Sequence, residues 1–359
     1  MSAHSPKELR TLDYCTWCPR LCHFSCPSAL GEASEDASAW GLMTLARTLD
    51  RNEMPATQAS LERLWSCASC YRCQSFCKHG NDVPTVLATA RANAVRAGAL
   101  PMSLGPLAEQ VATRGAAVDD PDGLNRLLAR ERSVAEKAVV ATFFPGCDHA
   151  SSSEGHTRVR RTLALLGELL GGEVKLAWRE DQVCCGGTAK RLGLDDAQRR
   201  QELGTDSGTS VNTHPRITDC ADLAIRDGWT SLWSVLAAHS SELGDRCGDL
   251  SPVTVALHGG CRERRLADTS REEIAVLEAT GIQVVTTRAV NDVDECCAGD
   301  PVYREARPDA SLRAAAAAAD SWHGVDGERV TSACRCAAQF TAAGTPVRSL
   351  LDVVLERCA

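Results

Sequence analysis

The sequence lacks long hydrophobic runs, and no segment approaches the ~20 uninterrupted apolar residues that a membrane-spanning helix needs. Its first residues, 1–8, show no apolar core of a signal peptide. Aromatic residues make up only 4% of the chain, so alanine, leucine and valine must build most of the core. We therefore expect a globular cytoplasmic protein, with peripheral membrane association only through a partner.

Two further absences narrow the function. The net charge of -8 gives no reason to expect a nucleic-acid partner. No Gly-x-Gly-x-x-Gly fingerprint is present, so the chain has no obvious flavin or nicotinamide site of its own. A length of 359 residues is sufficient for two or three domains and a sizeable core.

Cysteine, in contrast, is abundant. The chain has 19 cysteines, an odd number that does not indicate a disulfide framework in a protein without a secretion signal. Cys247 and Cys358 are scattered, and we expect them to be small buried hydrophobes. Sixteen others fall into tight runs or recurring positions, which is typical of metal ligands.

The densest run is the eleven-residue stretch 67–77. Its cysteines are spaced as in bacterial ferredoxins, where three thiolates bind one cubane and the fourth binds a neighbouring one. The members of this run are Cys67, Cys70, Cys73 and Cys77.

An earlier run has one longer step but keeps the Cys-Pro ending, and its members are Cys15, Cys18, Cys22 and Cys26. Zinc is the main rival for four thiolates. Two runs of four, one in ferredoxin spacing, favour two [4Fe–4S] clusters. In two-cluster ferredoxins the last cysteine of each run binds the cluster of the other run, which we call the crossing rule. This rule assigns Cys15, Cys18, Cys22 and Cys77 to one cluster, and Cys67, Cys70, Cys73 and Cys26 to the other.

Helical patterns surround these runs. Apolar periodicity predicts a helix over 38–50 and another over 58–65, and Asp82 is a candidate N-cap for a helix to about Ala97 that Gly98 ends. The region therefore resembles the α-helical ferredoxin domain of the fumarate reductase iron–sulfur subunit type. We place this domain at 1–98, followed by a linker at 99–133 that is rich in proline and glycine. His23 and His79 lie beside ligands, and we expect hydrogen-bonding or surface roles because cysteines fill all eight ligand places.

The rest of the chain contains an internal repeat, with a first repeat at 134–250 and a second repeat at 251–359. Each begins with a strand and a single cysteine, followed by a helix, a short strand and a cysteine pair. The spacing from single to paired cysteine is 37 residues in one repeat and 35 in the other. The cysteines are Cys147, Cys184 and Cys185 in the first repeat, and Cys261, Cys296, Cys297, Cys334 and Cys336 in the second. The expected strands are 138–144, 174–177 and 209–213, then 253–257, 282–286 and 328–332; the expected helices are 157–170 and 271–280.

This alternation of strands and helices predicts βαβ units and parallel sheets. Ligand sites in such sheets lie at the carboxyl ends of the strands, which is where all these cysteines fall. Loops from three strands should therefore bring their sulfurs together. A vicinal disulfide or simple core packing would not explain why each pair recurs with a matching upstream cysteine.

These motifs resemble the cysteine-rich, Cys-Cys-Gly domain family, which includes heterodisulfide reductase and the iron–sulfur subunits of anaerobic glycerol-3-phosphate dehydrogenase and glycolate oxidase. The resemblance implies an α/β fold, in which an all-α ferredoxin-like domain precedes two Rossmann-like repeats. It also implies a third iron–sulfur cluster in the second repeat, non-cubane in heterodisulfide reductase. The second repeat departs from the pattern at Ala298, where the family has glycine, and has one residue fewer between Cys334 and Cys336.

We expect the first repeat to be degenerate, with an incomplete or vestigial site. His214 and Ile217 stand where the last cysteine pair belongs, and Cys220 follows three residues later as a substitute. Because histidine can ligate iron–sulfur clusters, His214 remains an alternative ligand. In the second repeat, His258 is either a donor or proton carrier near the cluster or a satisfied loop residue, and Arg335 either balances the cluster's charge or is merely exposed beside it.

Three functions follow from these patterns. The first is an electron-transfer subunit that receives electrons from a flavoprotein dehydrogenase and passes them through the clusters to a quinone or another carrier. The second is an enzyme that reduces a disulfide at the cluster of the second repeat. The third is a zinc-bound interaction scaffold.

Overall fold

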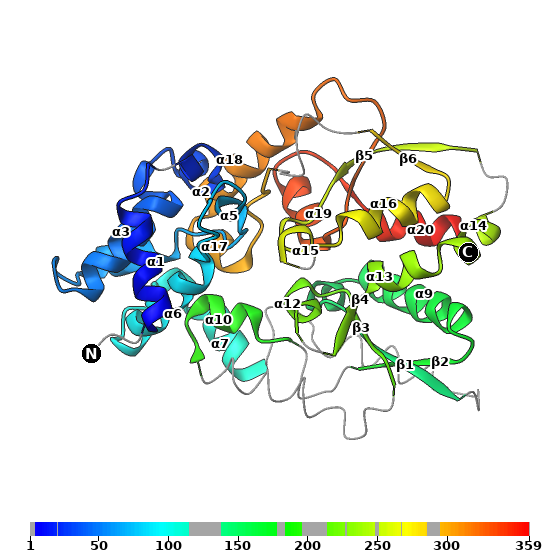
Figure 1. Cartoon of the computed structure of the whole chain (residues 1–359), viewed down its shortest axis with the longest axis horizontal. Helices are drawn as coiled ribbons and strands as arrows, with labels where there is room; N and C mark the ends of the chain where they lie inside the picture. The colour runs from blue at the N-terminus through cyan, green and yellow to red at the C-terminus, as the bar shows by residue number, and fades with distance from the viewer. Residues whose placement is uncertain are drawn as a thin grey trace.

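The computed structural model describes residues 4–19, 21–114, 138–177, 184–195, 214–226, 228–247, 251–266, 268–285 and 295–358. Within them, a helical N-terminal part is followed by two parallel sheets with alternating helices, as the sequence predicts (Figure 1). The expected strand at 209–213 lies outside the described residues. In the described part of the chain, no helix combines the length and apolar character that a membrane crossing requires.

The N-terminal helices begin and end where the sequence signals indicate. Ser38 caps α3 by accepting a hydrogen bond from the Gly41 amide, and Asp82 caps α6 through the Thr85 amide at 3.1 Å. Gly98, just beyond α6, has a φ of +78°, a conformation that glycine adopts without strain. The helices are α1 (Pro6–Thr16), α2 (Pro27–Glu32), α3 (Ala39–Asp50), α4 (Gln58–Glu62), α5 (Arg72–Ser75), α6 (Val83–Arg96) and α7 (Gly105–Arg114).

Two four-stranded sheets share one topology. The first sheet has the order β2-β1-β3-β4 and the second β6-β5-β7-β8, and all neighbouring strands are parallel. The matching orders confirm the internal repeat, and β4 and β8 extend each predicted sheet by one short strand. The strands are β1 (Val139–Phe144), β2 (Glu173–Leu176), β3 (Arg216–Thr218), β4 (Trp229–Ser231), β5 (Val253–His258), β6 (Ile282–Val285), β7 (Glu328–Thr331) and β8 (Arg348–Ser349).

Helices of the two repeats pack against each other between the sheets (Figure 1). Helix α9 (Ser153–Leu169) contacts α20 (Leu350–Arg357), and α13 (Leu232–Ala238) contacts α16 (Ser270–Ala279). One hydrophobic core therefore spans both repeats, with Leu166 and Trp233 on one side and Leu277 and Val354 on the other. The remaining helices are α10 (Gly187–Leu192), α12 (Ala221–Ala224), α14 (Ser240–Cys247), α15 (Cys261–Leu266), α17 (Pro301–Ala306), α18 (Pro308–Ala319) and α19 (Cys334–Ala342).

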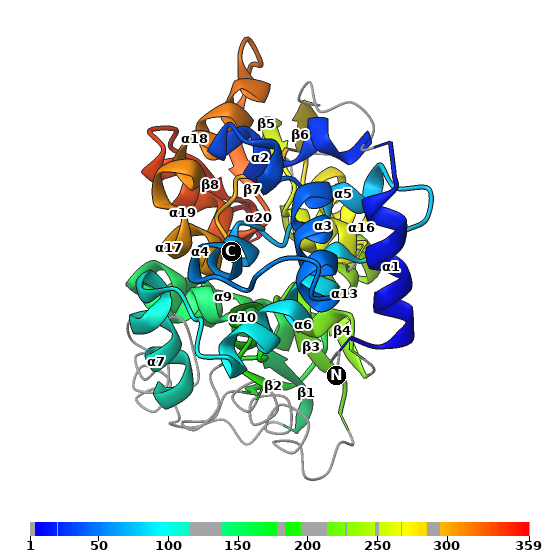
Figure 2. The same cartoon turned by 90° about the vertical axis from the view of Figure 1, so that its left-hand side faces the viewer.

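The N-terminal helices lie across one end of both repeats (Figure 2). Toward the first repeat, Trp65 Nε1 donates to the Leu192 carbonyl at 3.3 Å. Toward the second, Arg313 Nε donates to the Gly31 carbonyl at 2.8 Å, and a Cβ at Gly31 would meet the Ala310 carbonyl oxygen at 2.2 Å. The close approach of α2 to α18 therefore requires glycine at position 31.

Candidate metal centres and the cavity between the repeats

Three cysteines of the first run and the last cysteine of the second run line one pocket, and they are Cys15, Cys18, Cys22 and Cys77. Asn81 Nδ2 donates a hydrogen bond to Cys15 Sγ at 3.2 Å. Burial is the main reason that the pKa of the Cys15 thiol rises to about 12, and its three neighbouring thiols act in the same direction. The structure thus brings together the four thiols that the crossing rule assigns to one cluster.

The other four thiols of the N-terminal part, those of Cys26, Cys67, Cys70 and Cys73, also lie together. Burial raises the pKa of the Cys26 thiol to about 12, and Cys70 and Cys67 raise it further. Burial likewise raises the pKa of the Cys73 thiol, and Cys22 of the first group raises it further. Buried thiols of this kind ionise when a bound cation compensates the charge, so both donor sets fit iron–sulfur clusters.

The second thiol group is also in contact with the second repeat. A hydrogen-bonding contact with Cys296 lowers the pKa of the Cys70 thiol to about 6, and the same contact acts on Cys296. Arg265 Nη1 donates to the Cys70 carbonyl at 2.9 Å and holds this loop against α15. Residues far apart in the sequence therefore place a ferredoxin-type thiol directly beside the cysteine pair of the second repeat.

Four thiols of the second repeat face one cavity, and they belong to Cys261, Cys296, Cys297 and Cys336. Cys296 Sγ lies 3.8 Å from Cys261 Sγ, and Cys297 Sγ lies 3.1 Å from Cys336 Sγ. Ala298 has a φ of +53°, and its amide donates to Cys296 Sγ at 3.3 Å. The left-handed backbone explains why the related motif has glycine at this position, as at Gly186 of the first repeat with a φ of +87°.

The first repeat also gathers four thiols, those of Cys147, Cys184, Cys185 and Cys220. Cys220 Sγ lies 3.5 Å from Cys185 Sγ, and Cys184 is in hydrogen-bonding contact with Cys147 and Cys185. The ligand atoms of Cys185, Cys220 and Asp222 lie within 4.8 Å of one another, a donor set that fits a metal ion. His214 is exposed and precedes β3, so it stands at the opposite end of the strand from these sulfurs. The structure therefore places Cys220, and not the alternative His214, beside the cysteine pair.

The last cysteines of the two repeats occupy comparable helix starts. Cys220 is the N-cap of α12 and Ala333 is the N-cap of α19, and in each case the amide donates to the last threonine of the preceding strand. Three residues on, the third helical positions carry Leu223 and Cys336. Each repeat therefore retains a different member of a Cys-x-x-Cys pair.

Cys334, expected as a ligand in the second repeat, is placed differently from Cys336. Its Sγ lies 3.1 Å from Arg158 Nη1 and 3.8 Å from both ring nitrogens of His149, residues of the first repeat. Burial opposes protonation of His149, but Cys334 and Asp219 raise the pKa of that imidazole to about 10. Cys334 takes part in none of the sulfur-to-sulfur contacts described above for the first and second repeats.

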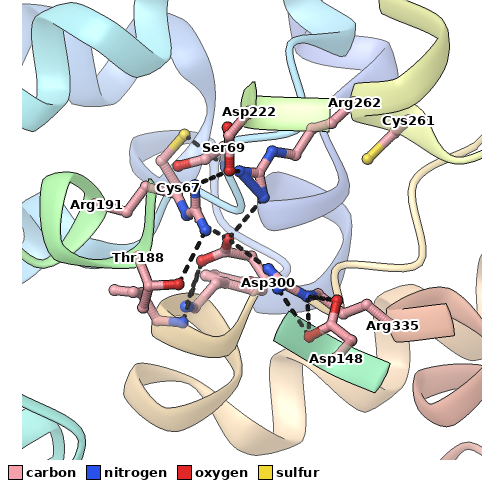
Figure 3. A network of polar contacts seen from close by, with 12 residues as sticks. Cys67, Ser69, Asp148, Thr188, Arg191, Asp222, Cys261, Arg262, Asp300 and Arg335 are labelled. Atoms are coloured by element: carbon pink, nitrogen blue, oxygen red, sulfur yellow. Dashed lines mark hydrogen bonds and ion pairs between the residues drawn. The ribbon is translucent and has the colours of Figure 1, made fainter. Parts of the chain in front are cut away.

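The cavity also contains sulfurs of the first repeat, because Cys147 and Cys220 line it together with the thiols of the second. A network of three arginines and three aspartates adjoins it, of which Arg191 and Asp300 are buried and the others half-buried (Figure 3). Arg335 Nη2 lies 2.9 Å from Asp148 Oδ1, and Arg262 pairs with Asp222, so both ion pairs cross between the repeats. Arg191 Nε lies 2.7 Å from Asp300 Oδ2 and makes a third crossing. Arg335 Nη2 also lies 3.9 Å from Cys147 Sγ of the first repeat, and its role in balancing the charge of the second-repeat cluster stays a prediction.

Burial alone would raise the pKa of the Asp222 carboxyl, but Arg262 and Arg191 hold it well below its usual range. The Asp148 pKa is likewise lowered by Arg335 against the effect of burial. Both carboxylates therefore stay charged and balance guanidinium groups at the cavity.

His258 is 2% exposed and packs edge-on against Phe340 and Trp322, with ring centroids 4.9 and 5.7 Å away.

Sequence reasoning missed most of this charge network. Arg335 was considered because it lies between two cysteines. Asp300 also carried a local signal, because an aspartate directly before proline is a typical helix start, and it caps α17 through the Val302 amide at 3.1 Å. Arg91 was also missed; its guanidinium is fully buried and donates to the carbonyls of Leu64, Arg191 and Cys67 at 2.9, 3.0 and 3.1 Å. It places a positive charge beside the second thiol group.

Comparison with known protein families agrees with this geometry. A family model described as a 4Fe-4S dicluster domain matches residues 11–81. A model described as a cysteine-rich domain matches twice, over residues 141–214 and 255–341. Searches among characterised proteins and among solved structures returned no match. The iron–sulfur domains indicate a role in electron transfer.

Proposed function

We propose that this chain, which belongs to the iron–sulfur proteins that combine a 4Fe-4S dicluster domain with cysteine-rich domains, relays electrons for a partner dehydrogenase. The partner would be a flavoprotein that oxidises a small hydroxy acid, polyol phosphate or methylated amine. Electrons would enter at the N-terminal clusters and leave from the second repeat to a quinone or another carrier. The chain's lack of a nucleotide fingerprint supports a separate dehydrogenase.

The contact between Cys70 and Cys296 is the observation that carries this proposal. Three thiol groups form a continuous series, because Cys22 and Cys73 are neighbours in the N-terminal part and Cys70 adjoins the second repeat. Bound iron–sulfur clusters would supply the single-electron steps. The chain's own residues hold the ligands in a fixed order and place guanidinium groups of Arg91 and Arg335 nearby to balance negative charge. The ligands that the fold buries from water include Cys26, Cys70, Cys296, Cys297 and Cys336.

We assign the ligands as the structure groups them. The two N-terminal [4Fe–4S] clusters would use the crossed sets, and a third site would use Cys261, Cys296, Cys297 and Cys336. The first repeat would hold a further metal on Cys147, Cys184, Cys185 and Cys220. Thiolates are the usual iron–sulfur ligands, which supports iron over a purely structural role for these sites.

The relay is tested with anaerobically reconstituted protein. Dithionite reduction should give iron–sulfur signals in electron paramagnetic resonance, and a soluble quinone such as menadione should reoxidise them in stopped-flow experiments. Cys296→Ser should leave the N-terminal clusters reducible but slow their reoxidation at least tenfold. Cys247→Ser, outside all thiol groups at the cavity, is the matched control. Absence of any reducible iron–sulfur signal would refute the proposal, and zinc without iron would favour the scaffold.

A second function is favoured by the shared cavity. Because thiols of both repeats line it, a small substrate could meet both metal sites at once. This arrangement suits reduction of a disulfide without a partner protein. The discriminating measurement is whether a small disulfide reoxidises the dithionite-reduced protein catalytically; a relay subunit would not turn over.

A further inference from the structure

The N-terminal part exposes a group of aromatic side chains. Tyr14, Trp17, Phe24 and Phe76 are 50%, 78%, 79% and 41% exposed, whereas the other aromatic side chains that the structure describes are buried or half-buried. All four lie within or directly beside the two N-terminal cysteine runs. Aromatic residues are enriched at protein interfaces, where their large apolar surfaces leave water. Their grouping at these runs therefore indicates a surface that another molecule covers.

These aromatic residues gather at the pocket of the first N-terminal thiol group. Phe76 and His79 line the pocket together with the four cysteines, and the Tyr14 ring stacks on His79 with centroids 5.1 Å apart. Phe24 lies on a short helix that contacts α5, and α5 ends directly before Phe76. Trp17 directly precedes the second cysteine of the first run. We call Tyr14, Trp17, Phe24 and Phe76 the aromatic patch.

The charge around the aromatic patch differs from that of the whole chain. Residues 14–31 and 63–81 include both cysteine runs, and all 47 acidic residues of this chain of net charge -8 lie outside them. Lys78 lines the same pocket and is exposed. Asp13, which precedes the patch, is paired with Arg47 at 2.8 Å. The patch therefore combines aromatic groups with positive charge, a combination that complements an acidic protein surface.

We propose that the aromatic patch and Lys78 bind an acidic surface of the flavoprotein that donates electrons to this chain. The inference rests on the proposed relay and adds where the partner docks and which charge it carries. All four cysteines at the patch are half-buried, whereas Cys296, Cys297 and Cys336 at the other end of the thiol series are buried. A donor on the patch lies beside the more accessible end, where its reduced flavin gives one electron at a time to a bound cluster.

The test uses the reconstituted full-length protein and reduced flavodoxin, a small acidic flavoprotein, in anaerobic stopped-flow experiments. The rate of cluster reduction should fall about tenfold between low and high salt, because screening weakens the attraction between opposite charges. Dithionite is a small donor that needs no docking surface. The flavodoxin rate of each variant is therefore divided by its dithionite rate, which removes any change in the clusters themselves.

Two variants probe the docking surface. Lys78→Glu should lower the rate ratio about tenfold at low salt, because it reverses the charge that attracts the acidic donor. The double variant Trp17→Ala, Phe24→Ala should lower it by a similar factor, since exposed aromatic side chains are the typical anchors of an interface. Lys175→Glu on β2 is the matched control for charge, and Met102→Ala is the control for loss of an exposed apolar side chain.

The proposal is overturned if either patch variant matches its control, or if flavodoxin fails to reduce wild-type protein that dithionite reduces. The second result would leave the electron relay intact, whereas absence of any dithionite-reducible signal would refute the relay itself. Sedimentation with phosphatidylglycerol vesicles tests a membrane as the alternative occupant. Binding to these vesicles that is lost in the double variant would also overturn the proposal.

Discussion

The two repeats have the same strand order but opposite charges at comparable positions. The residue after the first cysteine is Asp148 in the first repeat and Arg262 in the second. The second residue of the last ligand-bearing helix is Asp222 in the first repeat and Arg335 in the second. These groups pair crosswise between the repeats, so the two repeats present complementary charges to each other around the cavity.

The cysteines diverge in a complementary way as well. The first repeat keeps the N-cap cysteine and the second keeps the third-position cysteine, so each retains four thiols where the related motif has five. The expectation of an incomplete first site arose from His214 and Ile217, and the sulfur of Cys220, the substitute that the sequence offered, lies 3.5 Å from the sulfur of Cys185. The following experiments test how alike the two sites are.

The largest expected effect is loss of metal. Cys220→Ser should remove the metal of the first repeat, and Cys336→Ser that of the second, because a serine hydroxyl is a poorer iron–sulfur ligand than a thiolate. Iron and acid-labile sulfide per chain, with electron paramagnetic resonance, measure both losses. Cys247→Ser should retain all metal; a full complement in Cys220→Ser would show that the first repeat does not use this residue.

The next largest expected effect comes from disrupting the ion pairs between the two repeats. Asp300→Asn keeps the Oδ1 acceptor that caps α17 but removes the charge that Oδ2 offers to Arg191. Arg191 then keeps Asp222 as an anionic partner at 3.0 Å, and the loss of its charge-assisted contact with Asp300 should lower the free energy of unfolding by about 2 kcal/mol. Urea denaturation of the reconstituted protein measures this, with the exposed Asp326→Asn as control. A loss equal to that of the control would mean that the network does not stabilise the interface.

A smaller effect on stability is expected from substituting the residue that directly follows each cysteine pair. Gly186→Ala in the first repeat should cost about 1–2 kcal/mol because the residue is left-handed. Ala298→Gly should change stability by less than about 1 kcal/mol, since relief of strain is offset by the entropy of glycine. Thermal or urea unfolding of both variants provides the comparison; equal and opposite shifts would show that local backbone strain dominates at both positions.

The smallest effects concern the threonines that end β3 and β7. Thr218 Oγ1 accepts from the Cys220 amide at 3.0 Å and donates to the Phe144 carbonyl at 2.9 Å. Thr331 Oγ1 accepts from the Ala333 amide at 3.4 Å. Thr218→Val should therefore cost about 1–2 kcal/mol and Thr331→Val about 1 kcal/mol or less. Urea midpoints at equal m-values give the difference, and the reverse order would contradict this hydrogen-bond assignment.

Much of the fold could be predicted because its signals are local. Apolar periodicity and caps located α3 and α6, and the alternation of strands with helices predicted parallel sheets. The boundaries of the third strand in the first repeat could not be predicted: β3 begins at Arg216, after the His214-Pro215 step that the sequence analysis placed beyond the strand. A three-residue strand next to proline carries too little pattern to be located from the sequence.

The sequence alone determined that the protein is built around clustered thiols, because ligand spacing within a loop is a property of neighbouring residues. Beyond the two N-terminal groups, which the cysteine spacing predicted, only the tertiary structure decided which thiols meet. Cys70 adjoins Cys296, Cys220 adjoins Cys185, and Cys334 turns toward Arg158. The physical reason is that each contact joins segments brought together by the packing of two sheets and a helical domain, and no spacing along the chain encodes that approach.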